Sequence, residues 1–494
     1  MKINLKNISK LLFLQFAILS FAFGQPPTIT SFTPTTGGTG TTVTITGTNF
    51  TGVRAVTFGG TEATSFVVVS ATSITAVVAI GKTGTISVTT SDGIATSTGI
   101  FTFISAQTNV SGVISNSTTW NLVGSPYVVQ GNILIQSGII LTIDPGVSVK
   151  FDGNYYIEVA GGIVANGTAN NHITFTSNKP QPNKGDWLDM RFDDSAIDAT
   201  TGGNDDYLSG SVLNYCIFEF GKGMYIYNSI PYISNSIFRN NAYNPYNDAY
   251  SNGGGFNNVL IRTNFQSGSG SFVFRNNKIE NNDAGIGLVQ LGGLVVQKVL
   301  NNTFIKNGTA VGFAPHGGGT IIVKGNIIYS NSTAMDFTRG TNQSQIENNL
   351  VIANDVSIHF YQGTPQFNRN AFCNNKDGVT ICCSNNGTFG YFVSNTFYSN
   401  GGNTLVDRPT SLTNNNFLTN TKVSYILNGY SGFNAQYNYW GTTDLSVIAT
   451  KINNYLDAFS SPQVTINPIL TSPDTSAPIS PPQTNKIPTT GGVK

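Results

Sequence analysis

The chain has few charged side chains, few cysteines and no long apolar run. Only 10% of its 494 residues are charged, with 25 Lys and Arg against 24 Asp and Glu. This balance provides no basic field for a polyphosphate, so we expect no nucleic-acid partner. Helical bundles draw their surfaces from Glu, Lys and Arg, so the deficit also argues against a helical protein. With 54 Gly and abundant Thr, Ser and Asn, the composition favours an all-β fold.

The N-terminal residues have the three-part layout of a secretory signal peptide. Three lysines within the first ten residues precede an apolar run from Leu11 to Phe23, which is too short to span a bilayer. We therefore predict a signal peptide at 1–24 and a secreted, extracellular or cell-surface location. No later segment is long and apolar enough to predict a transmembrane segment after signal cleavage.

Four cysteines in an exported chain of this size cannot be its main stabiliser, because disulfide-dependent domains are smaller and richer in cysteine. Cys373 lies close in sequence to Cys382 and Cys383. One disulfide among these three is one interpretation, and buried free thiols are the other.

Residues 25–105 alternate as short strands separated by Gly-rich turns, for example at Thr42–Thr46, Ala55–Phe58 and Thr85–Thr90. No helical period occurs, so this segment predicts a small β-sandwich. The run Pro26-Pro-Thr-Ile-Thr-Ser-Phe-Thr-Pro and the later Val56-Thr-Phe-Gly-Gly resemble the IPT/TIG immunoglobulin-like domain. That resemblance implies a spacer or adhesive module without an active site.

An asparagine pattern, Asn-x-apolar-x-x-Asn, repeats through the second half of the chain, whereas residues 51–100 contain no Asn. Its copies begin at Asn235, Asn277, Asn302, Asn326, Asn349, Asn370, Asn395 and Asn415, and a related copy at Asn438 closes the series. The copies are 20 to 25 residues apart, except that 42 residues separate the first two, which fits two coils or one coil with a long insert. This period excludes helical repeats, and the alternating apolar residues predict a parallel β-helix over 107–470.

Asparagine suits the corners of a β-helix for two reasons. It tolerates the left-handed backbone conformation, and its side-chain amide can bond the matching Asn in the coils above and below. At about 23 residues per coil, the region would hold about 15 coils. Residues 471–494 are rich in Pro, Ser and Thr and predict a linker or disordered tail.

The earlier coils lack the asparagines but alternate in the same way, as in Leu141-Thr-Ile-Asp-Pro-Gly-Val-Ser-Val-Lys-Phe. Together with Gly185-Asp-Trp and Asn438-Tyr-Trp-Gly, they resemble the right-handed parallel β-helix repeats of the pectate-lyase-like superfold. The resemblance implies this fold but no single function, because the superfold hosts lyases, hydrolases, adhesins and ice-binding proteins.

Seven of the 24 Asp and Glu residues fall within residues 186–206. Three interpretations remain open: a Ca²⁺ site, an acid–base pair, or a solvated insert between strands. The spacing matches no EF-hand or repeat-based calcium motif. If a cofactor is bound, we expect it to be Ca²⁺, held by Asp193, Asp194, Asp205 and Asp206.

Tyrosines gather after this insert. We expect a strand from Met224 to Tyr227. Side chains alternate along a strand, so if Met224 and Ile226 point inward, Tyr225 and Tyr227 point outward. Exposed aromatic rings beside amide and carboxylate groups suit sugar rings, whereas packing against loops is the alternative. The candidate carbohydrate-binding residues are Trp187, Tyr225, Tyr227, Tyr232, Tyr243, Tyr246 and Tyr250.

Motifs for catalysis are missing. The polygalacturonase-like Arg-Ile-Lys does not occur, and His316-Gly-Gly follows Pro315 where that pattern needs Gly. His172, His316 and His359 are scattered without ligand spacing, so we expect solvent-facing or hydrogen-bonded side chains and no zinc site. The sequence therefore favours a non-catalytic monomer that binds a polysaccharide or cell-surface glycan. The alternative is a polysaccharide lyase or glycoside hydrolase, with acidic polysaccharides among its substrates.

Overall fold

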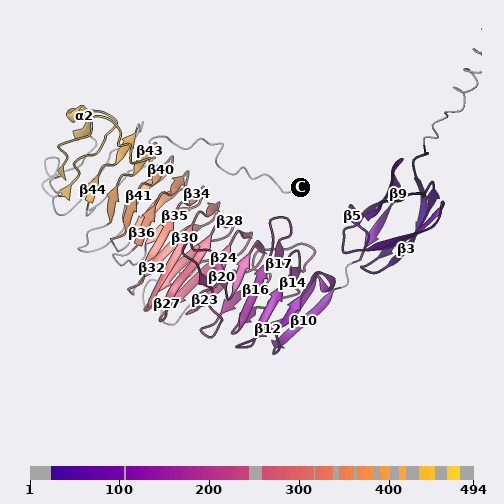
Figure 1. Ribbon diagram of the computed structural model, residues 1–494. Helices are drawn as coiled ribbons and strands as arrows, with labels where there is room; N and C mark the ends of the chain where they lie inside the picture. Colours follow the sequence, from indigo (N-terminus) through magenta and orange to yellow (C-terminus); the bar gives the residue numbers. More distant parts are fainter. Residues whose placement is uncertain are drawn as a thin grey trace, which may run out of the picture. The chain divides into compact units, whose positions relative to one another are not determined.

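The computed structural model describes residues 24–104, 107–243, 259–315, 318–337, 344–360, 364–381, 390–400, 411–418, 433–450 and 464–478. The chain divides into two compact units between Gln107 and Thr108 (Figure 1). The predicted signal peptide lies outside the described residues except for Gly24, and the predicted tail lies outside them from residue 479 on. In the described part of the chain no helix is long and apolar enough to cross a membrane.

The first unit is the predicted β-sandwich. One sheet has the order β1-β3-β7-β6 and the other the order β2-β9-β8-β4-β5. Inward-facing side chains such as Val43, Ile45 and Phe101 are fully buried between them. The strands are β1 (Thr28–Thr33), β2 (Thr36–Gly37), β3 (Thr42–Thr48), β4 (Ala55–Phe58), β5 (Thr61–Glu62), β6 (Ser65–Ser70), β7 (Ser73–Val77), β8 (Gly84–Thr90) and β9 (Gly93–Phe103).

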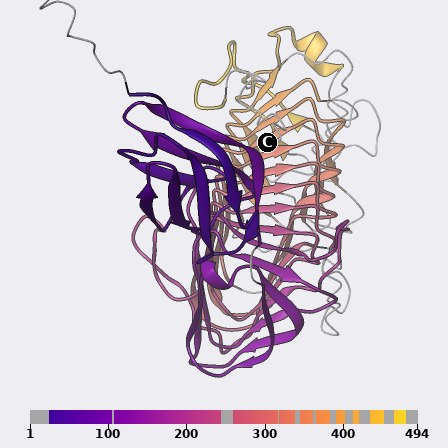
Figure 2. The same ribbon diagram turned by 90° about the vertical axis from the view of Figure 1, so that its right-hand side faces the viewer.

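The second unit is a parallel β-helix, in which the strands of successive coils lie over one another (Figure 2). It begins with β10 (Thr108–Ile114) and β12 (Tyr127–Ile135), and its strand pairings form three parallel sheets. Sheet 1 contains β14 (Ser148–Phe151), β17 (Ile173–Ser177), β22 (Cys216–Glu219), β25 (Ile237–Arg239), β28 (Lys278–Glu280), β31 (Thr303–Ile305), β34 (Ile327–Tyr329), β37 (Leu350–Ile352), β40 (Ala371–Cys373), β43 (Thr396–Tyr398) and β45 (Asn416–Leu418).

Sheet 2 contains β15 (Ile157–Val159), β18 (Met190–Phe192), β23 (Met224–Tyr227), β26 (Ile261–Phe265), β29 (Ile286–Gln290), β32 (Thr309–Pro315), β35 (Thr333–Phe337), β38 (Val356–Phe360) and β41 (Asp377–Ile381). Sheet 3 contains β11 (Thr118–Trp120), β13 (Ile140–Ile143), β16 (Gly162–Asn166), β21 (Val212–Asn214), β24 (Tyr232–Ser234), β27 (Ser269–Arg275), β30 (Leu294–Leu300), β33 (Ile321–Lys324), β36 (Ser344–Glu347), β39 (Gln366–Asn368), β42 (Tyr391–Val393) and β44 (Ser411–Thr413).

Smaller elements lie outside the three sheets. These are the 3-10 helix η1 (Leu122–Gly124), the hairpin of β19 (Thr200–Thr201) and β20 (Tyr207–Ser209), the pair of β46 (Phe433–Asn434) and β47 (Val464–Thr465), and the helix α2 (Leu445–Ala449).

The β-helix has fewer coils than its length predicts. Within the described residues sheet 3 has 12 strands, because the connections between successive sheet strands at 178–189, 193–211 and 240–260 use residues without adding coils. β25 pairs directly with β28, so the interval of 42 residues between the first two repeat copies is one coil with an insert.

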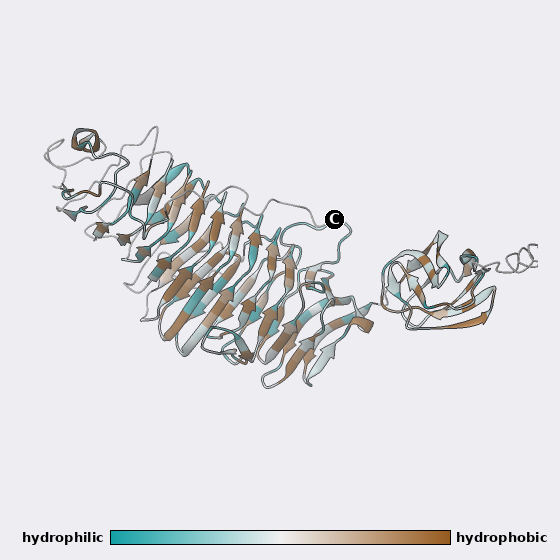
Figure 3. Ribbon diagram, turned by 45° about the horizontal axis from the view of Figure 1, so that its top comes forward, coloured by the Kyte–Doolittle hydropathy of each residue, from teal (hydrophilic) through white to brown (hydrophobic). Residues whose placement is uncertain are grey.

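The interior is apolar and layered, and in Figure 3 hydrophobic and hydrophilic residues alternate along the strands. Inward rings stack from coil to coil, as in Phe218 on Phe175 and Phe238, with centroids 4.7 and 4.9 Å apart. A second stack runs from Phe397 through Phe417 to Trp440. Since coils repeat at about 4.8 Å, equivalent rings meet face to face and the repeat itself builds the core.

Two buried asparagine ladders run along the corners on either side of sheet 1. Within the described residues the first contains Asn277, Asn302, Asn326, Asn349, Asn370, Asn395, Asn415 and Asn438, and the second contains Asn241, Asn282, Asn307, Asn331, Asn354, Asn375 and Asn400. In the middle of the first ladder, Asn326 accepts from the backbone N–H and Nδ2 of Asn302, and donates Nδ2 to Val299 O and Asn349 Oδ1. Each such amide therefore uses both donors and both acceptor sites.

The first repeat copy is one residue later than the sequence pattern indicates. Asn235 and Asn240 are outside the ladders, and the ladder positions are held by Ser236, whose backbone N–H donates to Asn277 Oδ1, and by Asn241. The paired register agrees, because buried Phe238 lies opposite Ile279.

The left-handed conformation is adopted by the residue before each ladder asparagine. Asn276, Asn301 and Asn348 have φ values of 56°, 54° and 53° and precede Asn277, Asn302 and Asn349. Lys306 and Ala353 take the same conformation in the second ladder. The expectation that the repeat asparagines themselves adopt it holds for Asn235 and Asn240, with φ values of 49° and 55°, which precede the ladder positions. It is wrong for the ladder asparagines, whose amides form the ladder bonds.

Candidate functional site

The outward face of sheet 2 carries a row of large polar and aromatic side chains in its early coils. In this row Glu158 pairs in register with Arg191, Arg191 with Tyr225, and Tyr225 with Arg262. A second position beside the row pairs Tyr227 with Asn264. Because equivalent residues of stacked coils lie about 4.8 Å apart, these side chains are neighbours on the outer side of sheet 2. Glu158, Arg191, Tyr225 and Tyr227 are partly exposed, whereas Arg262 and Asn264 are only 2% and 1% exposed.

Two tyrosines from one strand dominate this surface. In β23, Met224 and Ile226 are fully buried in the core, whereas Tyr225 and Tyr227 are half-buried on the outer face, as the alternation predicts. Their ring centroids are 6.4 Å apart and their planes differ by 16°. Asn264 Nδ2 donates to the Tyr225 hydroxyl at 3.0 Å. The rings are therefore held nearly parallel beside an amide.

Arg191 extends the surface on the preceding coil. Its Nε lies 2.7 Å from Asp189 Oδ1, and its guanidinium carbon lies 3.8 Å from the centre of the Tyr156 ring. Ion pairing and contact with the ring face both restrict the arginine, so it presents a fixed edge. We call the partly exposed Tyr156, Arg191, Tyr225 and Tyr227 the tyrosine face. Asn264 is 1% exposed and supports this face through its bond to Tyr225.

The other candidate aromatic residues lie elsewhere. Trp187 is 1% exposed, stacks on Phe151 with centroids 4.2 Å apart, and donates Nε1 to Glu219 O. It is a core residue and cannot contact a ligand, contrary to the expectation from sequence.

Tyr232 is likewise unavailable, because the hairpin of β19 and β20 covers it. It is 6% exposed, its hydroxyl donates to Asp205 O, and its ring lies 5.6 Å from that of Tyr207. Burial raises the pKa of Tyr232. Tyr243 is 42% exposed but begins the insert, and the remaining candidates, Tyr246 and Tyr250, lie outside the described residues.

The acidic insert is split between two places and does not form a calcium site in the described residues. Asp193 and Asp194 follow β18. Asp205 and Asp206 lie in the turn of the β19–β20 hairpin. No group of three or more His, Cys, Asp or Glu side chains that could hold a metal occurs in the described part of the chain.

The hairpin aspartates serve instead as counter-charges to sheet 3. Lys298 Nζ lies 2.5 Å from Asp205 Oδ1, and Arg275 contacts Asp206 Oδ1 at 3.3 Å. These contacts, with that of Tyr232, fasten the hairpin to the outer face of sheet 3. The donor set therefore does not fit Ca²⁺, whose ligands must be free to converge on one ion.

A polar pair that the sequence did not reveal lies further along the same outward face. His359 Nδ1 is 3.0 Å from Asp336 Oδ1 on the neighbouring strand. The hydrogen bond with Asp336 raises the pKa of His359. The two residues are 23 positions apart, one repeat length, so a correct coil register would have placed them side by side.

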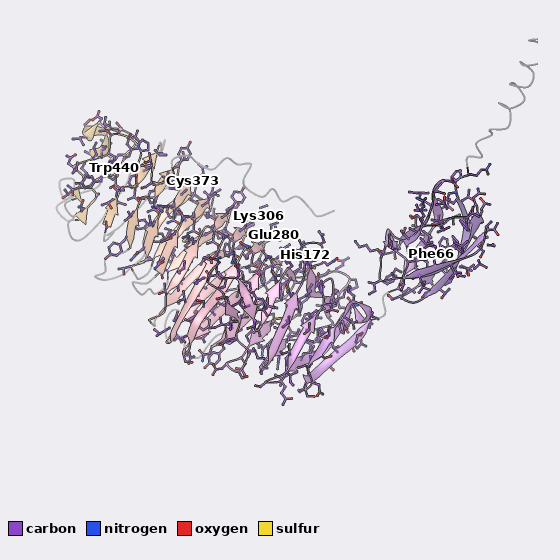
Figure 4. All side chains as sticks on the ribbon, viewed as in Figure 1. Phe66, His172, Glu280, Lys306, Cys373 and Trp440 are labelled. Atoms are coloured by element: carbon purple, nitrogen blue, oxygen red, sulfur yellow. The ribbon has the colours of Figure 1, made fainter. Side chains whose placement is uncertain are left out.

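The cysteines of the described residues are not bridged. Cys216 and Cys373 are buried free thiols, and burial raises the pKa of Cys373 to about 12. Cys373 lies in β40 toward the C-terminal end of the β-helix (Figure 4), whereas Cys382 and Cys383 lie outside the described residues. The bridge considered from sequence is thus not made by Cys373.

Two family models match parts of the chain. Residues 27–105 match the IPT/TIG domain, and residues 112–192 match the pectate-lyase like beta helix domain. A search of curated proteins found no match.

Two solved structures are similar only at low TM-scores. SGBP-B from a complex xyloglucan utilization locus in Bacteroides uniformis has a TM-score of 0.15 and 27% identity, over 16% of this chain and 24% of that one, so the chain spans about a quarter of its length. The family 28 exopolygalacturonase of Yersinia enterocolitica has a TM-score of 0.22 and 10% identity, over 91% of this chain and 97% of that one. At TM-scores this low, neither structure supports a conclusion about this chain. By the matched family models, residues 27–105 are an IPT/TIG domain and residues 112–192 belong to the pectate-lyase-like β-helix domain family.

Proposed function

We propose that the protein is secreted or displayed at the cell surface and binds a polysaccharide or cell-surface glycan through the tyrosine face, without catalysis. Export is supported by the signal-peptide pattern at 1–24. The IPT/TIG domain acts as a spacer, and the β-helix acts as the rigid support for the binding face.

The observation that carries this proposal is the pair of nearly parallel rings of Tyr225 and Tyr227 on one strand, with Arg191 beside Tyr225 and the Tyr225 hydroxyl held by the buried Asn264. Sugar rings have apolar C–H faces edged by hydroxyls, so they stack on aromatic rings and bond to neighbouring N–H groups such as those of Arg191. The strand is part of a hydrogen-bonded sheet with a fully buried inner row, so both rings are positioned before a ligand arrives.

The test is glycan binding by the full chain after signal removal. We expect binding to at least one polysaccharide on an array, and a loss of affinity of about tenfold or more in a Tyr225→Ala/Tyr227→Ala variant, since two stacking contacts are removed. Tyr391→Ala is the matched control, because Tyr391 is an exposed tyrosine on the outer face of sheet 3. Equal losses in both variants, or none, would refute the proposal.

Catalysis on a polysaccharide is the second candidate, and one observation favours it: the Asp336–His359 pair, which resembles an oriented acid–base group. It lies four coils from Tyr225, about 19 Å at the usual strand spacing. Incubation with the bound polysaccharide should release no reducing ends or unsaturated products. Turnover that is lost in His359→Gln would establish the enzyme instead.

A further inference from the structure

The outer face of sheet 1 changes from charged to uncharged along the β-helix. In the earlier coils it carries ion pairs, Arg239 with Glu219 and Lys278 with Glu280, each at 2.7 Å. From β31 to β43 the outward positions carry no charge, and most of them are apolar. We call these residues the apolar strip: Thr303, Ile305, Ile327, Tyr329, Leu350, Ile352, Ala371, Cys373, Thr396 and Tyr398.

Part of the apolar strip is buried although it faces away from the core. In β40, Phe372 belongs to the main core, so Ala371 and Cys373 on either side of it point outward. These two are 5% and 0% exposed, and Ile352 on the preceding coil is 4% exposed. The three form a cluster separate from the main core. Burial this complete on an outward face indicates that another segment lies over it.

The coils of the strip do not supply that segment from either edge of sheet 1. From β31 to β40, each connection into sheet 1 from sheet 3 is two residues long, and each connection out to sheet 2 is three residues long. Since an extended residue spans only about 3.3–3.6 Å, these connections turn the corner and cannot fold back across the sheet. The asparagine ladders occupy the same corners.

A described segment from the C-terminal part of the chain does reach this face. The backbone N–H of Asp474 donates to Asn416 Oδ1 at 2.6 Å, and Asn416 Nδ2 donates to Asp474 O at 2.9 Å. Asn416 pairs in register with Thr396, and Thr396 Oγ1 donates to Pro478 O. Ala477 is 3% exposed. Residues 474–478 therefore cross the outer face from β45 to β43, toward the buried cluster at β40.

The residues that follow have the composition and length to continue over the strip. Residues 479–488 include Ile479, Ile487 and three prolines, which favour an extended backbone. Ten extended residues reach about 30 Å, whereas β43 and β31 are about 19 Å apart. We propose that the apolar strip is an interaction surface whose occupant is residues 479–488 of this chain, laid in extended form from β40 toward β31. This proposal is independent of glycan binding.

The reactivity of Cys373 tests whether the segment covers the strip. The full chain after signal removal is treated with N-ethylmaleimide, and each cysteine is followed by peptide mass spectrometry. We expect Cys373 to react about 100-fold more slowly than in the urea-unfolded chain, and Ile479→Asp/Ile487→Asp to raise its rate about tenfold, because carboxylates are costly against apolar side chains. Thr489→Asp/Thr490→Asp is the matched control, since it adds the same charges beyond the segment, and should change the rate by less than about twofold.

Cys216, buried in the core, shows whether a variant has kept its fold. If Cys216 stays protected and Ile479→Asp/Ile487→Asp does not raise the rate of Cys373, the proposal is wrong. It is also wrong if Cys373 reacts in the native chain as fast as in the unfolded chain. Protection of Cys373 that falls on dilution would mean that a second copy covers the strip instead.

A disulfide scan locates the segment even if the aspartate variant loses its fold. Ile479→Cys, Pro481→Cys and Gln483→Cys are introduced singly into the full chain and oxidised with copper phenanthroline, and the disulfides are mapped by mass spectrometry. We expect at least one of the three to form a disulfide with Cys373, and Gly492→Cys to form none with it. If none of the three is joined to Cys373, the strip has another occupant and the proposal is overturned.

Discussion

Replacing Asn326 by alanine tests whether the asparagine ladders stabilise the β-helix. Asn326 is 1% exposed, and its Oδ1 accepts the backbone N–H of Asn302 at 2.8 Å and its Nδ2 at 3.0 Å. Its own Nδ2 donates to Val299 O and Asn349 Oδ1, both at 2.9 Å. The substitution leaves at least the two donors of Asn302 buried without an acceptor.

The size of the effect follows from these contacts. A buried polar group left unpaired costs about 1–3 kcal/mol, so two orphaned donors predict a loss of about 2–6 kcal/mol in the free energy of unfolding. Asn368→Ala is the matched control, because Asn368 lies on the outer face of sheet 3, outside the ladders, and surface substitutions change stability by about 0.5 kcal/mol or less.

The assay is urea unfolding followed by circular dichroism and by tryptophan fluorescence, whose coincidence justifies a single free energy. We expect a lower midpoint for Asn326→Ala at an unchanged slope. An Asn326→Asp variant adds a check, since it keeps the acceptor but places a carboxylate in the core. Burial raises the pKa of such a group, so the destabilisation of this variant should grow as pH rises. If Asn326→Ala loses no more stability than Asn368→Ala, the ladder does not stabilise the fold.

Three further predictions concern individual side chains. The hydrogen bond to Asp336 raises the pKa of His359, so the pair stabilises the fold fully below the ordinary value of 6.5 and ceases to do so as pH rises through the raised value. The difference in melting temperature between wild type and His359→Gln should therefore be larger at about pH 5.5 than at about pH 9. An equal difference at the two pH values would contradict this. Trp187→Ala should cost about 3–5 kcal/mol in urea unfolding, because it empties a core position, and a cost near zero would mean that the ring is not buried. Adding calcium or EGTA should not move the melting temperature, because Asp205 is already paired with Lys298; a rise with calcium would show that the insert binds the ion.

The repeat architecture could be predicted because it depends on a local pattern. Period, apolar alternation and the ladder role of most asparagines follow from residues within one coil. The first copy could not be placed, since Asn235, Ile237 and Asn240 match the pattern fully, whereas the true ladder position 236 is a serine. Only the pairing of Phe238 with Ile279 between coils decides the register.

The residue that adopts the left-handed conformation at each corner is hard to predict from sequence for a related reason. Asparagine is suited both to the left-handed region and to side-chain ladders, and the sequence does not show which use prevails. In the structure a buried ladder amide takes precedence, and residues as different as Lys306 and Ala353 accept the left-handed conformation beside it. The ladder bonds evidently outweigh the cost of about 1–2 kcal/mol for that conformation.

The candidate site was only partly predictable. The outward direction of Tyr225 and Tyr227 follows from alternation within β23. The burial of Trp187 against Phe151 and the pairing of Asp205 with Lys298 do not, because each joins residues from different coils. Asp205 and Asp206, which are clustered in the sequence with other aspartates, instead form separate ion pairs with Lys298 and Arg275.

The most direct measurement is a crystal structure of the chain with an oligosaccharide of the polysaccharide that it binds. We expect the sugar rings to lie on the rings of Tyr225 and Tyr227, with hydroxyls within hydrogen-bond distance of Arg191, and no sugar atom within hydrogen-bond distance of Asp336 or His359. An oligosaccharide seated on the Asp336–His359 pair, or on the outer face of sheet 1 or sheet 3, would contradict the assignment of glycan binding to the tyrosine face.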